Sequence, residues 1–417
     1  MSFFSKLGEN IILPQDVLIQ SKETAAIPGA INATIGIATS NKKAMALPSI
    51  NKVITEINNS EYLPYSPTPG LPKMRELWKE KILADNPSIN KDFLSLPMVT
   101  TGITQGIDIA ANLFSERGDA LLLPNLFWQN YAQIYTIKLG NKIYKYNQFD
   151  ENNEFSISNF KETLYSIKED KISLILNFPN NPTGYTPSDV ELNSLVDVIS
   201  TYAKENKNKQ LIIVSDDAYF GLFFEKNHKT PTLSATYKLA ENENCLIVKL
   251  DGITKEFYSW GLRVGFITYY TKNDELRKIL LEKTQGYLRS TTSSPSNLSQ
   301  QIAVRLLDNK QSLEEKEIND KIKAAKELLG KVKVNESLVA YANLQGNIEE
   351  TDEKKYLIEE WSTSLKIIDK KLLDLFESEN KASALLYEAQ RAAEENAENK
   401  EMLSLESENK NNKLEND

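Results

Sequence analysis

The feature that most constrains the fold of this chain is an alternation of short apolar runs with helical patterns between about residues 110 and 270. Each run has the length of a strand and is continuously apolar, which is typical of strands buried on both faces of a parallel sheet. Alternation of such strands with helices predicts βαβ units. The runs begin at Ala120, Ile172, Leu211, Leu246 and Val264.

Polar or aromatic side chains follow four of these runs, in the segments 125–130, 179–184, 216–219 and 251–255. In open α/β sheets, ligands bind outside the carboxyl ends of the strands. We therefore expect these four segments to meet at one rim and to form the functional site.

Composition and charge exclude several other classes of protein. Hydrophobic residues make up 41% of the 417 residues and charged residues 26%, close to the average of soluble globular proteins. The sequence has no run of 18 apolar residues and no secretory signal, so we expect a soluble, cytoplasmic protein without a membrane partner. A net charge of −9 makes nucleic acid a poor candidate partner.

The single histidine and the single cysteine exclude further chemistries. A Ser-His-Asp or Cys-His mechanism would have to use His228, which lies in a polar run that is typical of a solvated loop. Cys245 opens an apolar run, and we interpret it as a small buried hydrophobe. A metal site built from these residue types is not expected.

A lysine and an arginine eight residues apart bracket the turn between the last two apolar runs. They are Lys255 and Arg263 in the segment 254–265. Together with Asn181 in segment 179–184 and the sequence Asp216-Asp217-Ala218-Tyr219, this segment resembles the fold type I, pyridoxal-phosphate-dependent class I/II aminotransferase family. The resemblance covers about residues 32–300, including the segments 65–72, 101–106 and 127–131. It implies an α/β fold with a mostly parallel sheet of the aspartate aminotransferase type and a smaller second domain.

The resemblance also implies roles for residues around a pyridoxal 5′-phosphate cofactor. Lys255 would hold the cofactor aldehyde as a Schiff base and then carry the substrate proton. Asp216 would pair with the pyridine nitrogen; period-two alternation places its neighbour Asp217 on the opposite face. Tyr219 and Asn181 would donate hydrogen bonds to the cofactor phenolate oxygen, and Asn181 would also border the substrate.

A second group of residues is implied for the phosphate, the ring face and the substrate. Arg263 and Thr254 would bind the phosphate together with backbone amides at the start of a helix. Trp128 would stack on the pyridine, and Tyr65 would reach the phosphate of a neighbouring subunit, which implies a homodimer. Gly36 would lie near the substrate carboxylate. The amides belong to Ile103, Thr104 and Gln105.

The sequence departs from the family pattern in two places. The family's C-terminal arginine, which clamps the substrate carboxylate, has no clear counterpart, because Arg391 lies in an acidic, helical context. Gly252 stands where the family commonly has a serine before the lysine. The most favoured function is an aminotransferase that acts on an amino acid and a 2-oxo acid. The alternatives are a cofactor-binding protein without turnover and a β-lyase of the same fold.

The composition changes after residue 296 and indicates the domain boundaries. Beyond it the chain has two glycines and no proline, and from Glu349 it is rich in Glu, Lys, Asn and Leu. We expect an N-terminal arm at 1–45, a large cofactor-binding domain at 46–290, a helical C-terminal domain at 291–392 and a disordered tail at 393–417.

Overall fold

The computed structural model describes residues 3–12, 21–24, 26–27, 36–37, 39–40, 43–44, 46–47, 49–221 and 230–308. The chain divides into two compact units, residues 1–18 with 36–324 and residues 19–35 with 325–417. Every strand and helix that is named below lies in the first unit. His228, Arg391 and the predicted helical C-terminal segment lie outside the described residues, so the predictions about them stay predictions.

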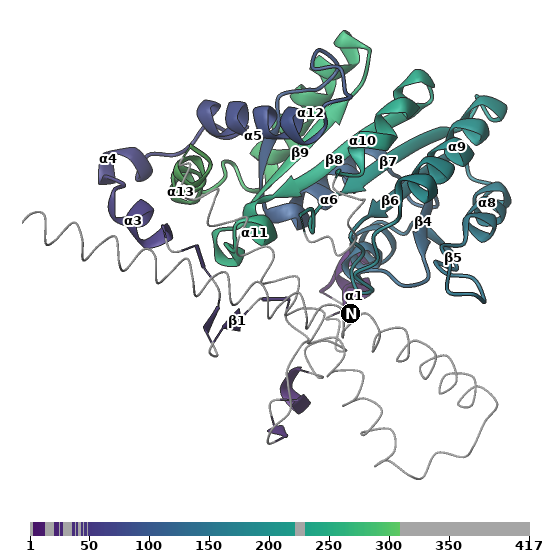
Figure 1. The fold of residues 1–417 in the computed structure, drawn as a ribbon, viewed down its shortest axis with the longest axis horizontal. Coiled ribbons are helices and arrows are strands. Elements are labelled where there is room, and N and C mark those ends of the chain that lie inside the picture. Colours follow the sequence, from purple (N-terminus) through teal and green to yellow (C-terminus); the bar gives the residue numbers. More distant parts are fainter. Residues whose placement is uncertain are drawn as a thin grey trace, which may run out of the picture. The chain divides into compact units, whose positions relative to one another are not determined.

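A seven-stranded sheet forms the centre of the first unit, with the order β3-β9-β8-β7-β6-β4-β5 (Figure 1). Strands β8, β7, β6, β4 and β5 run parallel, whereas β9 runs antiparallel to both β8 and β3. The strands are β3 (Met98–Thr101), β4 (Ala120–Pro124), β5 (Lys142–Tyr146), β6 (Lys171–Asn177), β7 (Gln210–Asp216), β8 (Cys245–Gly252) and β9 (Val264–Tyr270). The predicted mostly parallel α/β sheet is confirmed, and all five predicted strands are present; β3 and β5 are additional.

Two short strands, β1 (Thr39–Ser40) and β2 (Lys43–Ala44), pair separately. The helices are α1 (Lys6–Asn10), α3 (Ile50–Thr55), α4 (Asn59–Tyr62), α5 (Pro72–Asp85), α6 (Gly102–Phe114), α7 (Asn130–Ala132), η1 (Gln133–Lys138), α8 (Ile157–Ser166), α9 (Asp189–Glu205), α10 (Leu233–Thr236), η2 (Tyr237–Glu241), α11 (Ile253–Glu256), η3 (Trp260–Leu262), α12 (Asp274–Thr291) and α13 (Asn297–Asp308). None of the described helices is both long enough and apolar enough to span a lipid bilayer.

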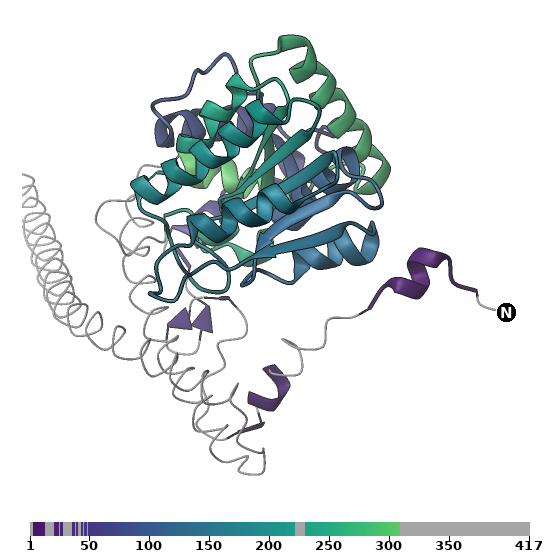
Figure 2. The same ribbon diagram turned by 90° about the vertical axis from the view of Figure 1, so that its right-hand side faces the viewer.

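Helices cover both faces of the sheet (Figure 2), and the strand side chains alternate between two apolar clusters. In β4, Leu122 packs in the cluster that includes α5, α8, α9 and α13, while Leu121 and Leu123 pack in the cluster that includes α6, η1 and α12. This is the period-two alternation of a strand buried on both sides. We call these two sides the α5 face and the α6 face.

Helix α5 packs on the sheet through one buried stripe. Pro72 occupies its first turn, where the missing N–H costs nothing. Met74, Trp78 and Ile82 recur at four-residue spacing and are all buried, so this stripe of α5 faces the sheet. The ring of Trp78 stacks on Phe266 of β9 with centroids 4.2 Å apart.

Candidate active site

The carboxyl ends of β6, β7 and β8 lie side by side, as the sequence predicts. These strands are parallel and end at Asn177, Asp216 and Gly252. Asn177 Nδ2 donates to the backbone oxygen of Asp216 at 3.0 Å, and Asn177 Oδ1 accepts from the Asn181 amide at 2.8 Å. The loop after β6 is thus tied directly to the end of β7.

Asp216 is the buried acid of this rim, with 1% of its surface exposed. Its carboxylate accepts a hydrogen bond from Tyr131 Oη at 2.7 Å and another from the Ala218 amide at 3.0 Å. Burial raises the pKa of Asp216 to about 6, although both hydrogen bonds oppose the shift. A buried acid with so high a pKa is stabilised in its charged form when a cation binds beside it.

Asp217 is equally buried, but its contacts lie elsewhere. It forms an ion pair with Lys249 and accepts from the Thr232 amide at 2.9 Å. Asp216, by contrast, contacts Tyr131, which belongs to the α6-face cluster. The two adjacent carboxylates therefore point to opposite faces of the sheet, as alternation along β7 predicts.

Lys255 lies on the four-residue helix α11, directly after β8. Its amine donates to the backbone oxygen of Gly36 at 3.1 Å and lies 5.2 Å from the centre of the Tyr219 ring. Tyr219 Oη in turn accepts from Asn181 Nδ2 at 3.4 Å. The structure thus brings together four of the residues selected from the sequence.

Three glycines bring the ends of β8, β9 and α6 into close contact. A methyl group on Gly252 would lie 2.8 Å from Gly265 Cα, and one on Gly265 would lie 2.6 Å from the carbonyl carbon of Gly102. Both distances are too short for any side chain. The serine that Gly252 replaces could not be accommodated in this arrangement, because the backbone of β9 fills the space.

This close contact places several potential phosphate ligands around one helix end. Arg263 lies over the first turn of α6, because a methyl group on Gly102 would lie 2.3 Å from Arg263 Nη2. The first turn also contains Ile103, Thr104 and Gln105, and helix starts present unpaired N–H groups to an anion. Thr254 is buried, and among the described residues its hydroxyl has no hydrogen-bond partner.

Gln105 also serves a structural role at this helix end. Its side-chain oxygen accepts from the Thr101 amide at 2.6 Å, and its Nε2 donates to Thr292 at 3.1 Å. The side chain therefore fixes the start of α6 against the end of α12.

Two of the predicted aromatic residues lie in different settings. Trp128 is partly buried and packs edge-to-face on Tyr131, with centroids 5.5 Å apart, which places it next to the Asp216 contact. Tyr65 lies between α4 and α5 and is 95% exposed. The role of Tyr65 stays a prediction about a neighbouring subunit.

Tyr131 and Asn177 are site residues that the sequence interpretation did not select. Tyr131 follows Trp128 by three residues, and its amide donates to the Trp128 carbonyl at 3.0 Å; Asn177 is the polar last residue of β6, directly after the apolar run 174–176. Both signals were available in the sequence. Cys245 is half-buried at the opposite end of β8 from Lys255, and burial raises the pKa of its thiol to about 12, in keeping with an unreactive residue.

Comparison with known proteins identifies the family. The model for aminotransferase class I and II matches residues 31–334. A probable aspartate aminotransferase from Methanocaldococcus jannaschii is 29% identical over 217 residues, which are 52% of this chain and 51% of that protein. A probable aspartate/prephenate aminotransferase from Rickettsia prowazekii is 25% identical over 307 residues, covering 72% of this chain and 70% of that protein. The chain thus spans between half and 70% of the length of these curated relatives.

Solved structures show the same fold. An aminotransferase from Anaerococcus prevotii has a TM-score of 0.70 at 22% identity, covering 81% of this chain and 84% of the other. The Thermus thermophilus aspartate aminotransferase with maleate has a TM-score of 0.61 at 17% identity, with coverages of 82% and 81%. At these identities the likeness concerns the fold.

Proposed function

This chain belongs to the class I and II aminotransferase family, and on that premise we propose that it transfers an amino group between an amino acid and a 2-oxo acid with pyridoxal phosphate as cofactor. The observation that carries the proposal is the convergence at one rim of an amine, a buried acid and an anion-binding helix start. These are supplied by Lys255, Asp216 and the first turn of α6.

The residues at the rim fit this cofactor. The unpartnered hydroxyl of Thr254, the Arg263 guanidinium and the start of α6 supply donors for a phosphate. Asp216 supplies a buried carboxylate for a protonated ring nitrogen. When bound, the cofactor acts as an electron sink that stabilises the carbanion left when the substrate loses its α-proton.

Lys255 has two roles in this proposal. Its amine would hold the cofactor through the aldehyde, and the freed amine would hold and return the α-proton of the substrate. The hydrogen bond to the backbone oxygen of Gly36 orients the amine without adding a charge. Tyr219 and Asn181, already bonded to each other, present donors to the phenolate oxygen beside this amine.

The substrate class is proposed from the relatives rather than from a binding pocket. The relatives from M. jannaschii and R. prowazekii are both named for aspartate, so we propose aspartate as the first amino donor to test, with 2-oxoglutarate as acceptor. Gly36 and Asn181 are the described residues at the rim that we propose for the substrate. We propose that an arginine for its carboxylate comes from outside the described ranges or from a second subunit.

The test is an absorbance spectrum of the purified protein with pyridoxal phosphate. We expect a visible band in the wild type and in Lys272→Met, a control that removes a lysine from a surface ion pair, and no such band in Lys255→Ala. Aspartate should then convert the band to that of the aminated cofactor. A band that no amino acid alters would favour cofactor binding without turnover. Pyruvate and ammonia released together without an acceptor, from an amino acid with a leaving group on Cβ such as cysteine, would favour a β-lyase.

A further inference from the structure

Asp216 and Lys255, the two central site residues, are each followed in the sequence by an acidic residue. The side chain of that acidic residue forms its contacts on the α5 face of the sheet. Asp217 follows Asp216, and Glu256 follows Lys255. A third acid, Asp251, is the penultimate residue of β8 and lies four residues before Lys255. All three are at most 6% exposed, so their charges need partners inside the protein.

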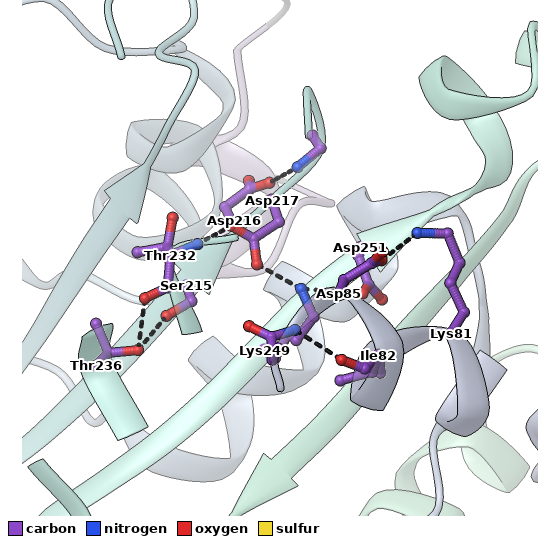
Figure 3. A network of polar contacts seen from close by, with 12 residues as sticks. Lys81, Ile82, Asp85, Ser215, Asp216, Asp217, Thr232, Thr236, Lys249 and Asp251 are labelled. Carbon is purple, nitrogen blue, oxygen red and sulfur yellow. Dashed lines mark hydrogen bonds and ion pairs between the residues drawn. The ribbon is translucent and has the colours of Figure 1, made fainter. Parts of the chain in front are cut away.

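Lys249 partners two of these acids. It projects from β8 and is 2% exposed. Its amine pairs with Asp217 and lies 3.0 Å from Asp251, so it links the end of β7 to the end of β8 (Figure 3). Asp251 also accepts a hydrogen bond from Trp78 Nε1 of α5 at 2.7 Å.

Lys81 partners the third acid from the same helix. Its amine lies 2.7 Å from Glu256 and also pairs with Asp85 one turn further along α5 (Figure 3 shows Lys81 and Asp85). Helix α5 therefore holds the Lys255 turn on both sides: Trp78 at Asp251 before the lysine, and Lys81 at Glu256 after it.

The two lysines stay charged despite their burial. Burial alone would lower the pKa of Lys249, but the carboxylates of Asp217 and Asp251 raise it above its ordinary value. For Lys81, Glu256 and Asp85 have the same effect against burial. Lys249 is therefore a cation bound to carboxylates, and it is unsuited to replace Lys255 as the reactive amine.

Such a cluster is a poor way to gain stability. Removing charges from water costs several kcal/mol per ion, and well-packed apolar residues often stabilise a fold as well or better. The cluster instead fixes the geometry of the site. Each of its hydrogen bonds and ion pairs holds a backbone segment that carries a site residue on the opposite side of the sheet.

We propose that a buried cluster on the α5 face of the sheet positions the residues of the cofactor site. The cluster consists of Lys249, Asp217, Asp251, Trp78, Lys81 and Glu256. Lys249 fixes the end of β7 relative to the end of β8, and α5 fixes the Lys255 turn relative to both. Asp216 and Lys255 are thereby held at a set separation, and Asp217 is held away from the ring nitrogen. The members of the cluster are positioning residues. The inference rests on the proposed cofactor site.

The experiment compares Lys249→Met with the control Lys272→Met, using the apo protein and added pyridoxal phosphate. The readouts are the melting temperature of the apo protein, the affinity for pyridoxal phosphate and the pH midpoint of the visible band. For Lys249→Met we expect about tenfold weaker binding, or about 1.4 kcal/mol of binding free energy, together with a shifted midpoint. A folded Lys249→Met protein that binds and titrates like the control would overturn the proposal.

The double variant Lys249→Met/Asp217→Asn separates positioning from stability. It restores the net charge of the cluster, so much of any lost melting temperature should return, but it leaves β7 untied to β8. Affinity and midpoint should stay displaced. Full recovery of the cofactor affinity and of the pH midpoint would show that the cluster serves stability alone.

If both of these variants fail to fold, Glu256→Gln decides. It keeps the shape of the side chain and removes only the charge that pairs with Lys81, and we expect a smaller change of about threefold in affinity. Unchanged binding and titration in Glu256→Gln would count against the proposal. A wild type without a visible band would instead overturn the proposed function, so the two failures are distinguishable.

Discussion

At the scale of single residues, Asp216 suits the proposed cofactor better than it suits the stability of the protein. Its carboxylate is buried and accepts two hydrogen bonds, yet its pKa is raised from 3.8 to about 6 because burial outweighs them. Without a cation beside it, an ionised Asp216 destabilises the folded state. A ring nitrogen that carries a proton would supply that cation.

We therefore predict that Asp216→Asn stabilises the apo protein at neutral pH and weakens the binding of pyridoxal phosphate. Because the folded pKa lies above the unfolded value, the folded state binds the proton more tightly, and the wild type loses stability as pH rises from about 4 to about 6. The two-unit shift corresponds to at most about 3 kcal/mol.

Urea unfolding of the apo proteins at pH 8 and pH 4 measures this effect. The gain in unfolding free energy should be present at pH 8 and vanish at pH 4. Asp197→Asn on the exposed side of α9 is the control and should change stability by less than about 0.5 kcal/mol at either pH. A gain that is the same at both pH values would show that the carboxylate charge is not its cause.

At the scale of secondary-structure elements, the start of α6, the proposed phosphate-binding end, depends on the close approach of three backbone segments. Gly265 lies between the end of β8 and the start of α6, with no room for a methyl group on the side of Gly102. Gly261, four residues earlier, is exposed and has nothing within 4 Å of a Cβ position. Gly261 is therefore a matched control for a substitution at Gly265.

We predict that Gly265→Ala pushes the start of α6 away from β9 and lowers the free energy of unfolding by about 1–3 kcal/mol, as overpacking does. Because the same movement separates Arg263 from the first turn of α6, the affinity for pyridoxal phosphate should also fall. Gly261→Ala should leave both quantities close to wild type. Chemical unfolding and cofactor titration measure them, and equal behaviour of the two variants would contradict the proposed role of this contact.

The elements also show which parts of the structure could be predicted from the sequence. The five continuous apolar strands were predictable because burial on both faces leaves a clear pattern. Strand β5 was missed because Lys142 and Lys145 interrupt its apolar residues, as is common at a sheet edge. Lys249 gave no signal of its burial, because a lysine within a strand is usually solvated and its two partners are known only once β7 and β8 are paired.

At the scale of the whole molecule, the described residues include most of the proposed cofactor site, but two of its expected parts are not found there. No arginine for a substrate carboxylate has been identified at the rim among the described residues, and Tyr65 is 95% exposed rather than at that rim. Leu63, two residues earlier, is 70% exposed. Exposed aromatic and aliphatic side chains of this kind are typical of residues that contact a partner. The homodimer that the sequence resemblance implies stays a prediction, and Tyr65 provides a test of it.

A mixing experiment tests whether Tyr65 acts in the neighbouring subunit. Tyr65→Ala keeps Lys255, and Lys255→Ala keeps Tyr65, so in a mixed dimer one of the two sites has both residues intact if Tyr65 crosses the interface. We predict that refolding the two variants together restores a visible band of near wild-type cofactor affinity in up to one site per mixed dimer. Each variant alone should show weak binding or no band.

The same experiment gives a distinct result if Tyr65 does not cross the subunit interface. If Tyr65 acts within its own subunit, every site in the mixture lacks either Tyr65 or Lys255, and mixing restores nothing. Light scattering on the same samples should give a mass of about twice 47.2 kDa if C₂ dimers form. Restored affinity in a sample of twice the monomer mass would establish a shared site, whereas a dimer without restoration would confine Tyr65 to its own subunit.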